Sequence, residues 1–283
     1  MTAPAGTPDK EQMRRFWRAR GEAWDRWADV VAESAARMNE PLIAAARIAP
    51  GLRVLDLASG AGQPALAIAE RVGPGGEVVA SDLVPQMLEG ARRRAEAAGL
   101  RQLRFETADM ERLPFADRAF DRVTCRFGIM FVPDPVQALA EARRVLVPGG
   151  RAAFMAWGPR EDTTMFRVIL AAADRVLGPD PENDMSSVFR FAEPGSLAAV
   201  FRKAGLVDVV EEELRLSGSA PVGKPFWRPQ VEMSLAPRLE RASEAERKAL
   251  DESVAEAFGE EISGESYRLS AHVRIVAGER PRG

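Results

Sequence analysis

Cysteine is almost missing from this chain of 283 residues, and it contains no long apolar run. The single cysteine, Cys125, excludes an internal disulfide framework and a multi-cysteine metal cluster. Nowhere do about 18 uncharged apolar residues follow one another, and the N-terminus lacks the apolar core of a signal peptide. The sequence therefore predicts a cytoplasmic protein with no membrane segment and no metal.

An excess of charge of either sign is missing as well. Lysine and arginine number 39 against 42 aspartates and glutamates, so the formal net charge is -3. No block of like charge indicates a nucleic-acid partner. A hydrophobic content of 46% in 283 residues is enough for one large α/β domain with a buried core, and a second independent domain is not required.

Strands alternate with helices from residue 53 onward. A buried strand is expected at 53–58, followed by a run of small residues and a helix that ends at Gly73. The same alternation predicts further strands at 77–82, 103–107, 120–125 and 151–157, with helices at 85–98 and 135–146. This pattern is typical of a parallel, doubly wound sheet.

The flanking segments are less regular. An apolar stripe predicts one amphipathic helix from Glu11 to about residue 37, and a second, short helix is expected from Pro41. After Trp157 we expect a helix at 166–177, a helix at 193–204, a charged strand at 207–216, a helix at 243–258 and a last strand at 267–278. The predicted organisation is a helical cap at 1–50, a sheet core at 51–158, a lid or insertion at 159–192, and residues 193–283 as the remainder of the same domain.

The turn after the first strand consists of small residues, from Ala58 to Gly62. Such a turn lets a ligand approach backbone N–H groups beside the N-terminus of a helix, and an adenosine-containing ligand is the usual occupant. The alternative is a tight turn that only packs. Asp82 ends the second strand, where a carboxylate can accept both ribose hydroxyls, and Asp109 follows the third, where one can accept an adenine amine. Either acid is also compatible with an ordinary loop position or a helix cap.

Five segments in order resemble the class I S-adenosylmethionine-dependent methyltransferases: "VLDLASGAG", "SDLVPQML", "TADMERLPF", "FDRVTCRFGIMFVPDP" and "RRVLVPGGRAAFMAW". The likeness is strongest to the branch of the ubiquinone and menaquinone biosynthesis C-methyltransferases, which are methyltransferases of type 11. It implies a Rossmann-like, doubly wound, seven-stranded sheet whose last strand is antiparallel. It also implies S-adenosylmethionine as cofactor, S-adenosylhomocysteine as product and a small organic acceptor methylated by in-line displacement.

The resemblance carries a set of cofactor-binding residues onto this chain. The turn would face the methionine end of the cofactor, Asp82 its ribose, and the residues after the third strand its adenine, with Arg126 and Phe127 beside the sulfonium. The complete set is Trp24, Asp56, Leu57, Ala58, Ser59, Gly60, Gly62, Gln63, Asp82, Leu83, Met87, Ala108, Asp109, Met110, Arg126 and Phe127. Ala58 replaces the first glycine of the family's turn, which is a mild departure. A second departure is Met130, which stands where the quinone-modifying relatives carry an arginine and would offer a flexible apolar wall.

Candidates for a catalytic base are scarce. His272 is the single histidine and falls on the polar face of the last predicted strand, and Cys125 is interpreted as a small buried residue. The catalytic residues, the acceptor atom and the oligomeric state therefore stay open. A protein that binds the cofactor without methyl transfer is one alternative. A nicotinamide-dependent oxidoreductase is another, because Gly60-Ala61-Gly62 also begins a dinucleotide-binding pattern.

The acceptor pocket is expected from segments outside the matched core. Trp17, Trp24 and Trp27 are candidates for its lid, together with the insertion at 166–191. In "GKPFWRPQVEM", Phe226, Trp227 and Met233 are candidates for lining a site for a flat or lipophilic molecule. The alternative for each is ordinary packing.

Overall fold

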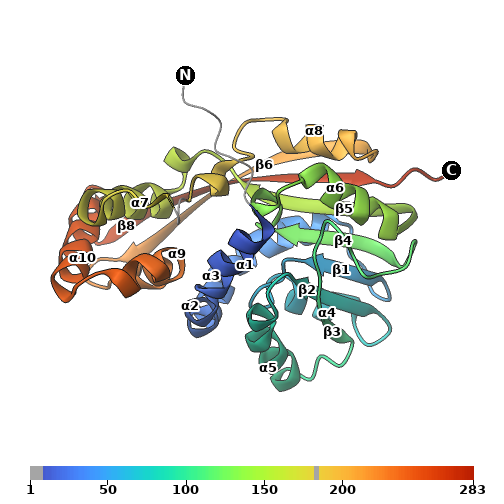
Figure 1. Ribbon diagram of the computed structural model, residues 1–283, viewed down its shortest axis with the longest axis horizontal. Helices are drawn as coiled ribbons and strands as arrows, with labels where there is room; N and C mark the ends of the chain where they lie inside the picture. Colours follow the sequence, from blue (N-terminus) through green and yellow to red (C-terminus); the bar gives the residue numbers. More distant parts are fainter. Residues whose placement is uncertain (1–8, 182–184) are drawn as a thin grey trace.

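The computed structural model describes residues 9–181 and 185–283, so residues 1–8 of the expected cap and 182–184 of the expected insertion lie outside it. Its sheet follows the order β3-β2-β1-β4-β5-β8-β6 (Figure 1). The strands are β1 (Arg53–Leu57), β2 (Glu77–Asp82), β3 (Leu103–Thr107), β4 (Phe120–Arg126), β5 (Leu146–Trp157), β6 (Val207–Pro221) and β8 (Ser266–Glu279). Strands β1 to β5 are parallel, whereas β8 runs antiparallel to both β5 and β6. The predicted Rossmann-like sheet with an antiparallel last strand is confirmed.

Helices cover both faces of the sheet, because side chains on both faces of its strands are buried. In β5, Ala152 and Phe154 join the core cluster under α6 (Pro135–Val145) and α8 (Ser196–Lys203). Ala153 and Met155 join the opposite cluster, under α3 (Ala28–Ala45) and α4 (Ala65–Val72). Helix α5 (Glu89–Ala97) follows the short 3-10 helix η1 (Pro85–Leu88). Successive side chains of a strand point to opposite faces, so a strand buried on both sides is apolar throughout.

The N-terminal segment differs from the prediction of one helix to about residue 37 and a second from Pro41. It forms α1 (Lys10–Arg18), α2 (Gly21–Arg26) and the longer α3, and Pro41 lies inside α3. The break after α1 has a physical cause. Arg20 is 1% exposed and donates hydrogen bonds to the carbonyl oxygens of Phe16 and Ser234. Satisfying this buried guanidinium outweighs the continuity of the helix.

Strands β6 and β8 extend beyond the carboxyl end of β5. The pairing of β5 with β8 ends at Trp157 and Val273, whereas β6 pairs with β8 as far as Pro221 and Ser266. Around this extension lie α7 (Thr164–Leu177), α9 (Arg228–Arg241) and α10 (Glu244–Gly259) (Figure 1). We call these three helices and the extended ends of β6 and β8 the outer lobe.

Two elements in this region were not predicted. Helix α9 contains Pro237 in its interior, and a proline at such a position weakens a helical pattern in the sequence. The short strand β7 (Ile262–Ser263) pairs with the start of β8. Among the described residues, no helix is long and apolar enough to cross a membrane.

An aromatic cluster joins the parts of the outer lobe. Trp227 stacks on Phe258 with ring centroids 5.2 Å apart and an interplanar angle of 12°. Phe226 contacts Phe258 and Tyr267, with centroid distances of 5.0 and 5.2 Å. These residues come from the segment before α9, from α10 and from β8, so the cluster connects three distant stretches of the chain.

We predict that Phe258→Ala lowers the free energy of unfolding by about 3 kcal/mol or more, because Phe258 is fully buried and its loss leaves a cavity. Urea unfolding followed by tryptophan fluorescence measures the change. Val222→Ala is the control, since Val222 is 43% exposed and should lose less than about 0.5 kcal/mol. A loss below about 1 kcal/mol for Phe258→Ala would contradict this account of the cluster.

Candidate cofactor and acceptor site

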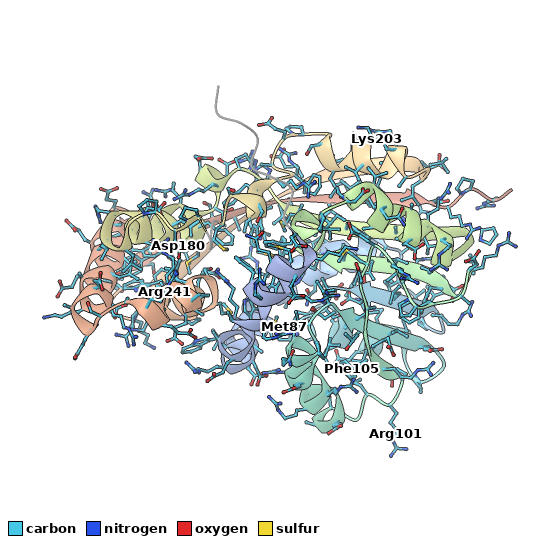
Figure 2. The ribbon with its side chains drawn as sticks, in the orientation of Figure 1. Met87, Arg101, Phe105, Asp180, Lys203 and Arg241 are labelled. Carbon is cyan, nitrogen blue, oxygen red and sulfur yellow. The ribbon has the colours of Figure 1, made fainter. Side chains whose placement is uncertain are left out.

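One cavity of about 500 Å³ lies at the carboxyl ends of the core strands, bordered by the N-terminal helices and the outer lobe. Of the sixteen predicted cofactor residues, only Asp56 and Gly62 are not among its lining. The others that line it are Trp24, Leu57, Ala58, Ser59, Gly60, Gln63, Asp82, Leu83, Met87, Ala108, Asp109, Met110, Arg126 and Phe127. Figure 2 shows Met87 on the side of the sheet that α1 and α2 cover. The fold therefore brings residues from four loops to one place.

The small-residue turn has a backbone that few side chains tolerate. Ala58, Gly60 and Gly62 have φ angles of 52°, 50° and 102°. A residue other than glycine is strained in this left-handed region of φ. Ala58 therefore adopts this backbone conformation at a cost in free energy. The loop after β4 packs closely against this turn, because a Cβ on Gly128 would lie only 2.4 Å from the Cβ of Ala58. The small size of both residues keeps the turn open to the cavity.

Asp56 supports the turn from below. Its carboxylate is fully buried and accepts hydrogen bonds from Ser59 Oγ at 2.7 Å and Thr124 Oγ1 at 2.6 Å. Burial raises the pKa of Asp56 to about 6, and these two hydrogen bonds oppose the rise. Asp56 thus connects β1, β4 and the turn, and a direct contact with the cofactor stays a prediction.

Asp82 lies at the end of β2 and lines the cavity. Its two carboxylate oxygens accept the backbone N–H groups of Gly60 and Val84, each at 3.0 Å. Each oxygen retains a lone pair that can accept a ligand hydroxyl. Burial raises the pKa of Asp82 to about 6 although both backbone bonds lower it. The position suits the predicted contact with ribose.

Asp109 has a partner that sequence reasoning missed. Its Oδ1 accepts the N–H of Glu111 at 2.9 Å, and its Oδ2 accepts Lys10 Nζ at 2.8 Å. Lys10 also pairs with Glu111. Burial lowers the pKa of Lys10, but its bonds to the two carboxylates raise it above the ordinary value. Helix α1 is thereby fixed over the predicted adenine end, and no motif around Lys10 marks this role in the sequence.

Two donors that line the cavity have no partner among the described residues. They are Trp24 Nε1 and Arg126 Nε, and both atoms are buried. An unpaired buried donor is costly, so both indicate a ligand with polar groups. Phe127 follows Arg126 with a φ of 60° and stacks on Trp157 at 4.2 Å with an interplanar angle of 3°. Together with the bare turn and the Asp82 carboxylate, these groups fit the hydroxyls and the carboxylate of S-adenosylmethionine.

The half of the cavity next to the outer lobe is mainly apolar, although Gln230, Ser234 and Ser270 also belong to its lining. Its wall, which we call the outer wall, consists of Met165, Phe166, Phe226, Met233 and Leu269. Trp17 also lines the cavity, whereas Trp27 lies outside the lining and donates its Nε1 hydrogen to Glu232 at 2.8 Å. Trp227 is likewise absent from the lining and belongs to the aromatic cluster.

Met130 requires a correction. It was expected to offer an apolar wall to the acceptor, but its side chain is fully buried in the core and does not line the cavity. The 3-10 helix of residues 129–131 turns this side chain inward, whereas Phe131 lines the cavity. The apolar surface that the sequence placed at Met130 is therefore supplied by its neighbour.

His272 lies outside the cavity lining and is 1% exposed. Its Nδ1 lies 2.8 Å from Asp162 Oδ2, and its Nε2 lies 2.7 Å from Glu213 Oε1. Its backbone carbonyl accepts the N–H of Gly158 at 2.8 Å. This placement between two carboxylates joins β6, β8 and the segment before α7.

Comparisons with known proteins point in one direction. Residues 54–150 match the family model described as a methyltransferase domain. The demethylmenaquinone methyltransferase of Deinococcus radiodurans is 40% identical over 163 residues, which cover 54% of this chain and 67% of that protein. The ubiquinone/menaquinone biosynthesis C-methyltransferase UbiE of Cupriavidus metallidurans is 36% identical over 176 residues, covering 59% and 72%. The crystal structure of the [4+2]-cyclase SpnF superposes with a TM-score of 0.55 at 22% identity, covering 89% of this chain and 82% of that one.

The chain belongs to the class I S-adenosylmethionine-dependent methyltransferases. Within them it is homologous to the demethylmenaquinone and UbiE methyltransferases, and it is a methyltransferase enzyme that uses S-adenosylmethionine. The alternative of a nicotinamide-dependent oxidoreductase is therefore wrong. The SpnF likeness shows the fold alone.

We predict that the affinity for S-adenosylhomocysteine falls as the pH falls, because only the ionised Asp82 carboxylate accepts both ribose hydroxyls. With a pKa of about 6, the ionised fraction drops between about pH 7 and pH 5 and raises the apparent dissociation constant roughly 10-fold. Calorimetric titration at each pH measures this dissociation constant. Asp82→Asn should bind more weakly throughout and lose most of the pH dependence, with any residual slope belonging to Asp56. A flat wild-type profile would contradict the assignment.

We predict that Gly128→Ala destabilises the fold by about 1 to 3 kcal/mol, because the added Cβ crowds both Ala58 and the Cys125 Sγ atom, the latter at 2.9 Å. Ala58→Gly in the same chain should recover part of this loss by removing the closer contact. Urea unfolding of both single variants and the double variant gives the coupling energy. Strictly additive effects would show that the turn and the loop after β4 do not pack as described.

Proposed function

We propose that this methyltransferase acts on a small, largely apolar organic molecule held against the outer wall. The observation that carries the proposal is the continuity of the cavity. The same 500 Å³ space is lined by the turn residues Ala58 and Gly60 at one end and by Phe166 and Leu269 at the other. An acceptor on the outer wall would share one continuous space with the cofactor.

S-adenosylmethionine supplies an activated methyl group when bound, so the protein needs mainly to align the acceptor and to exclude water. In this proposal Asp82 holds the ribose hydroxyls and the turn N–H groups approach the methionine portion. The ion pairs of Lys10 keep α1 closed over Asp109. The outer wall orients the acceptor for in-line displacement.

The lining of the cavity offers no evident catalytic base within residues 9–181 and 185–283. Its carboxylates, those of Asp82, Asp109 and Glu111, are all engaged with backbone N–H groups or with Lys10. His272 and Cys125 lie outside the lining. The proposed reaction therefore relies on an acceptor that reaches the cavity already nucleophilic.

The names of the relatives support a small-molecule acceptor. The name of the Deinococcus protein contains demethylmenaquinone, and the name of the Cupriavidus protein refers to ubiquinone and menaquinone biosynthesis. This chain carries Met130 where the quinone-modifying branch has an arginine, so the proposal does not extend to that substrate. A protein that binds the cofactor without transfer is the competing function, and the [4+2]-cyclase SpnF is an example of a protein with this fold and another name.

We predict that Leu269→Arg lowers the rate of methyl transfer on the order of 100-fold while the affinity for S-adenosylhomocysteine changes less than about 3-fold. The long charged side chain would occupy the acceptor end and leave the turn untouched. The measurement is transfer of radiolabelled methyl from S-adenosylmethionine to a library of small aromatic and lipophilic metabolites.

Leu269→Met is the matched control, because it keeps the volume and polarity of the wall. Wild-type transfer to at least one acceptor is the expected result. Tight cofactor binding with no transfer to any acceptor would favour the competing function instead.

A further inference from the structure

Asn39 is an amide buried beside the turn, although it does not itself line the cavity. It lies on α3 and is 4% exposed. Leu42 and Ile43, one helical turn further along, are buried in the core cluster under α3 and α4. Because positions three and four apart lie on one face of a helix, Asn39 is on the face of α3 that packs inward. The helix therefore presents this amide from a well-packed, rigid position.

One hydrogen bond uses the polar end of Asn39. Its Nδ2 donates to the Oε1 of Gln63 at 2.5 Å, across 24 positions of the chain. Its own Oδ1 is buried and accepts from no group in the part of the chain that the structure describes. Burying an unsatisfied amide oxygen costs free energy, and an apolar side chain of the same size would pack there at less cost. Packing alone therefore does not account for Asn39.

Gln63, the partner of Asn39, follows Gly62 in the turn and lines the cavity. Its Oε1 is engaged by Asn39, so what its amide can still offer a ligand is the pair of N–H donors on Nε2. Among the residues that the structure describes, none accepts a hydrogen bond from this Nε2. The bond from Asn39 thus decides which end of the Gln63 amide is available, and a ligand at this point must bring an acceptor.

The methionine portion of the cofactor carries both an acceptor and a donor. Its carboxylate has two oxygens with about four lone pairs, so it can accept the N–H groups of Gln63 as well as another donor such as Arg126 Nε. Its ammonium group donates only. An amide held the other way round, with Oε1 toward the ligand, would bind the ammonium group and repel the carboxylate. The orientation of one amide therefore decides which of the two groups it binds.

We propose that Asn39 is a positioning residue for the cofactor, which holds the Gln63 amide with its N–H groups toward the cofactor carboxylate. This inference rests on the part of the proposed function that places the methionine portion at the turn. Asn39 touches no ligand itself and acts through Gln63. Because the donor is oriented before the cofactor arrives, binding does not have to immobilise a free side chain.

The test compares two ligands that differ only in the amino-acid portion. S-adenosylhomocysteine carries the carboxylate and the ammonium group, whereas 5′-methylthioadenosine has the same adenosine and sulfur with a methyl group instead. Calorimetric titration of the full chain measures both dissociation constants. The variants are Asn39→Leu and Asn39→Asp, which nearly keep the size of asparagine, Gln63→Leu, and the double variant Asn39→Leu with Gln63→Leu. Ile43→Val is the matched control, because it loses packing on the same face of α3.

The wild type and Ile43→Val should prefer S-adenosylhomocysteine by at least about 10-fold. Asn39→Leu should weaken its binding about 5-fold, because Gln63 is then free to turn. Asn39→Asp should weaken it about 20-fold or more, because the new carboxylate accepts the Gln63 N–H groups and turns the amide oxygen toward the ligand. The double variant should match Gln63→Leu within about 2-fold. Binding of 5′-methylthioadenosine should change less than about 2-fold throughout, which also shows that each variant folds.

Several results would overturn the inference. Equal losses for the two ligands in Asn39→Leu would show that Asn39 only packs, and additive losses in the double variant would show that it acts through another group. Undiminished binding by Asn39→Asp would show that the amide oxygen of Gln63 faces the ligand. Equal binding of both ligands by the wild type would remove the methionine portion from the turn. Failure of methyl transfer gives a different pattern, namely the expected binding results with no product from any acceptor, and this pattern supports the role of Asn39.

Discussion

The site depends on one geometric constraint, the unequal length of the strands. The carboxyl ends of β1, β2 and β4 lie at one end of the sheet, and β5 stops there at Trp157. Strands β8 and β6 alone extend beyond these carboxyl ends, and they pair with each other. Their hydrogen-bonded ladder holds the outer lobe at a fixed distance from the turn, which is why a cavity exists between them.

The N-terminal helices close this space from the remaining side. Two kinds of contact hold these helices, one between charged groups and one between aromatic rings. Lys10 is tied to Asp109 and Glu111 by charge, while Trp17 packs edge-on against Phe131 at 4.8 Å. The apolar contact packs α1 against the loop after β4, and the charge contact fixes the same helix against the loop after β3. The closure therefore uses few residues although it covers both halves of the cavity.

The sheet core could be predicted from the sequence because its signals are local. The apolar run 53–58, the small-residue turn and the proline at the start of α6 each act within a few residues of themselves. Asp82 could be singled out for the same reason, since its position at a strand end fixes where its carboxylate lies. Most of the predicted cofactor residues follow from this local logic and from the family resemblance.

The remainder depends on contacts between distant residues, which no local pattern records. Lys10 meets Asp109 across 99 positions, and Arg20 meets Ser234 across 214. The break between α1 and α2 follows from the second contact. The stripe of apolar residues therefore predicts one helix where the chain forms several. Met130 was misplaced because a single 3-10 turn decides which of two neighbouring side chains faces the cavity.

The buried Arg20 contact has a consequence for how molecules enter. Its guanidinium joins the start of the chain to the carbonyl of Ser234 in α9, and Trp27 and Arg26 both donate to Glu232 of the same helix. The cap and the outer lobe are therefore bound to each other as well as to the sheet. A molecule that entered between the cap and the outer lobe would have to break these hydrogen bonds, so the same few contacts would govern that route for both reactants.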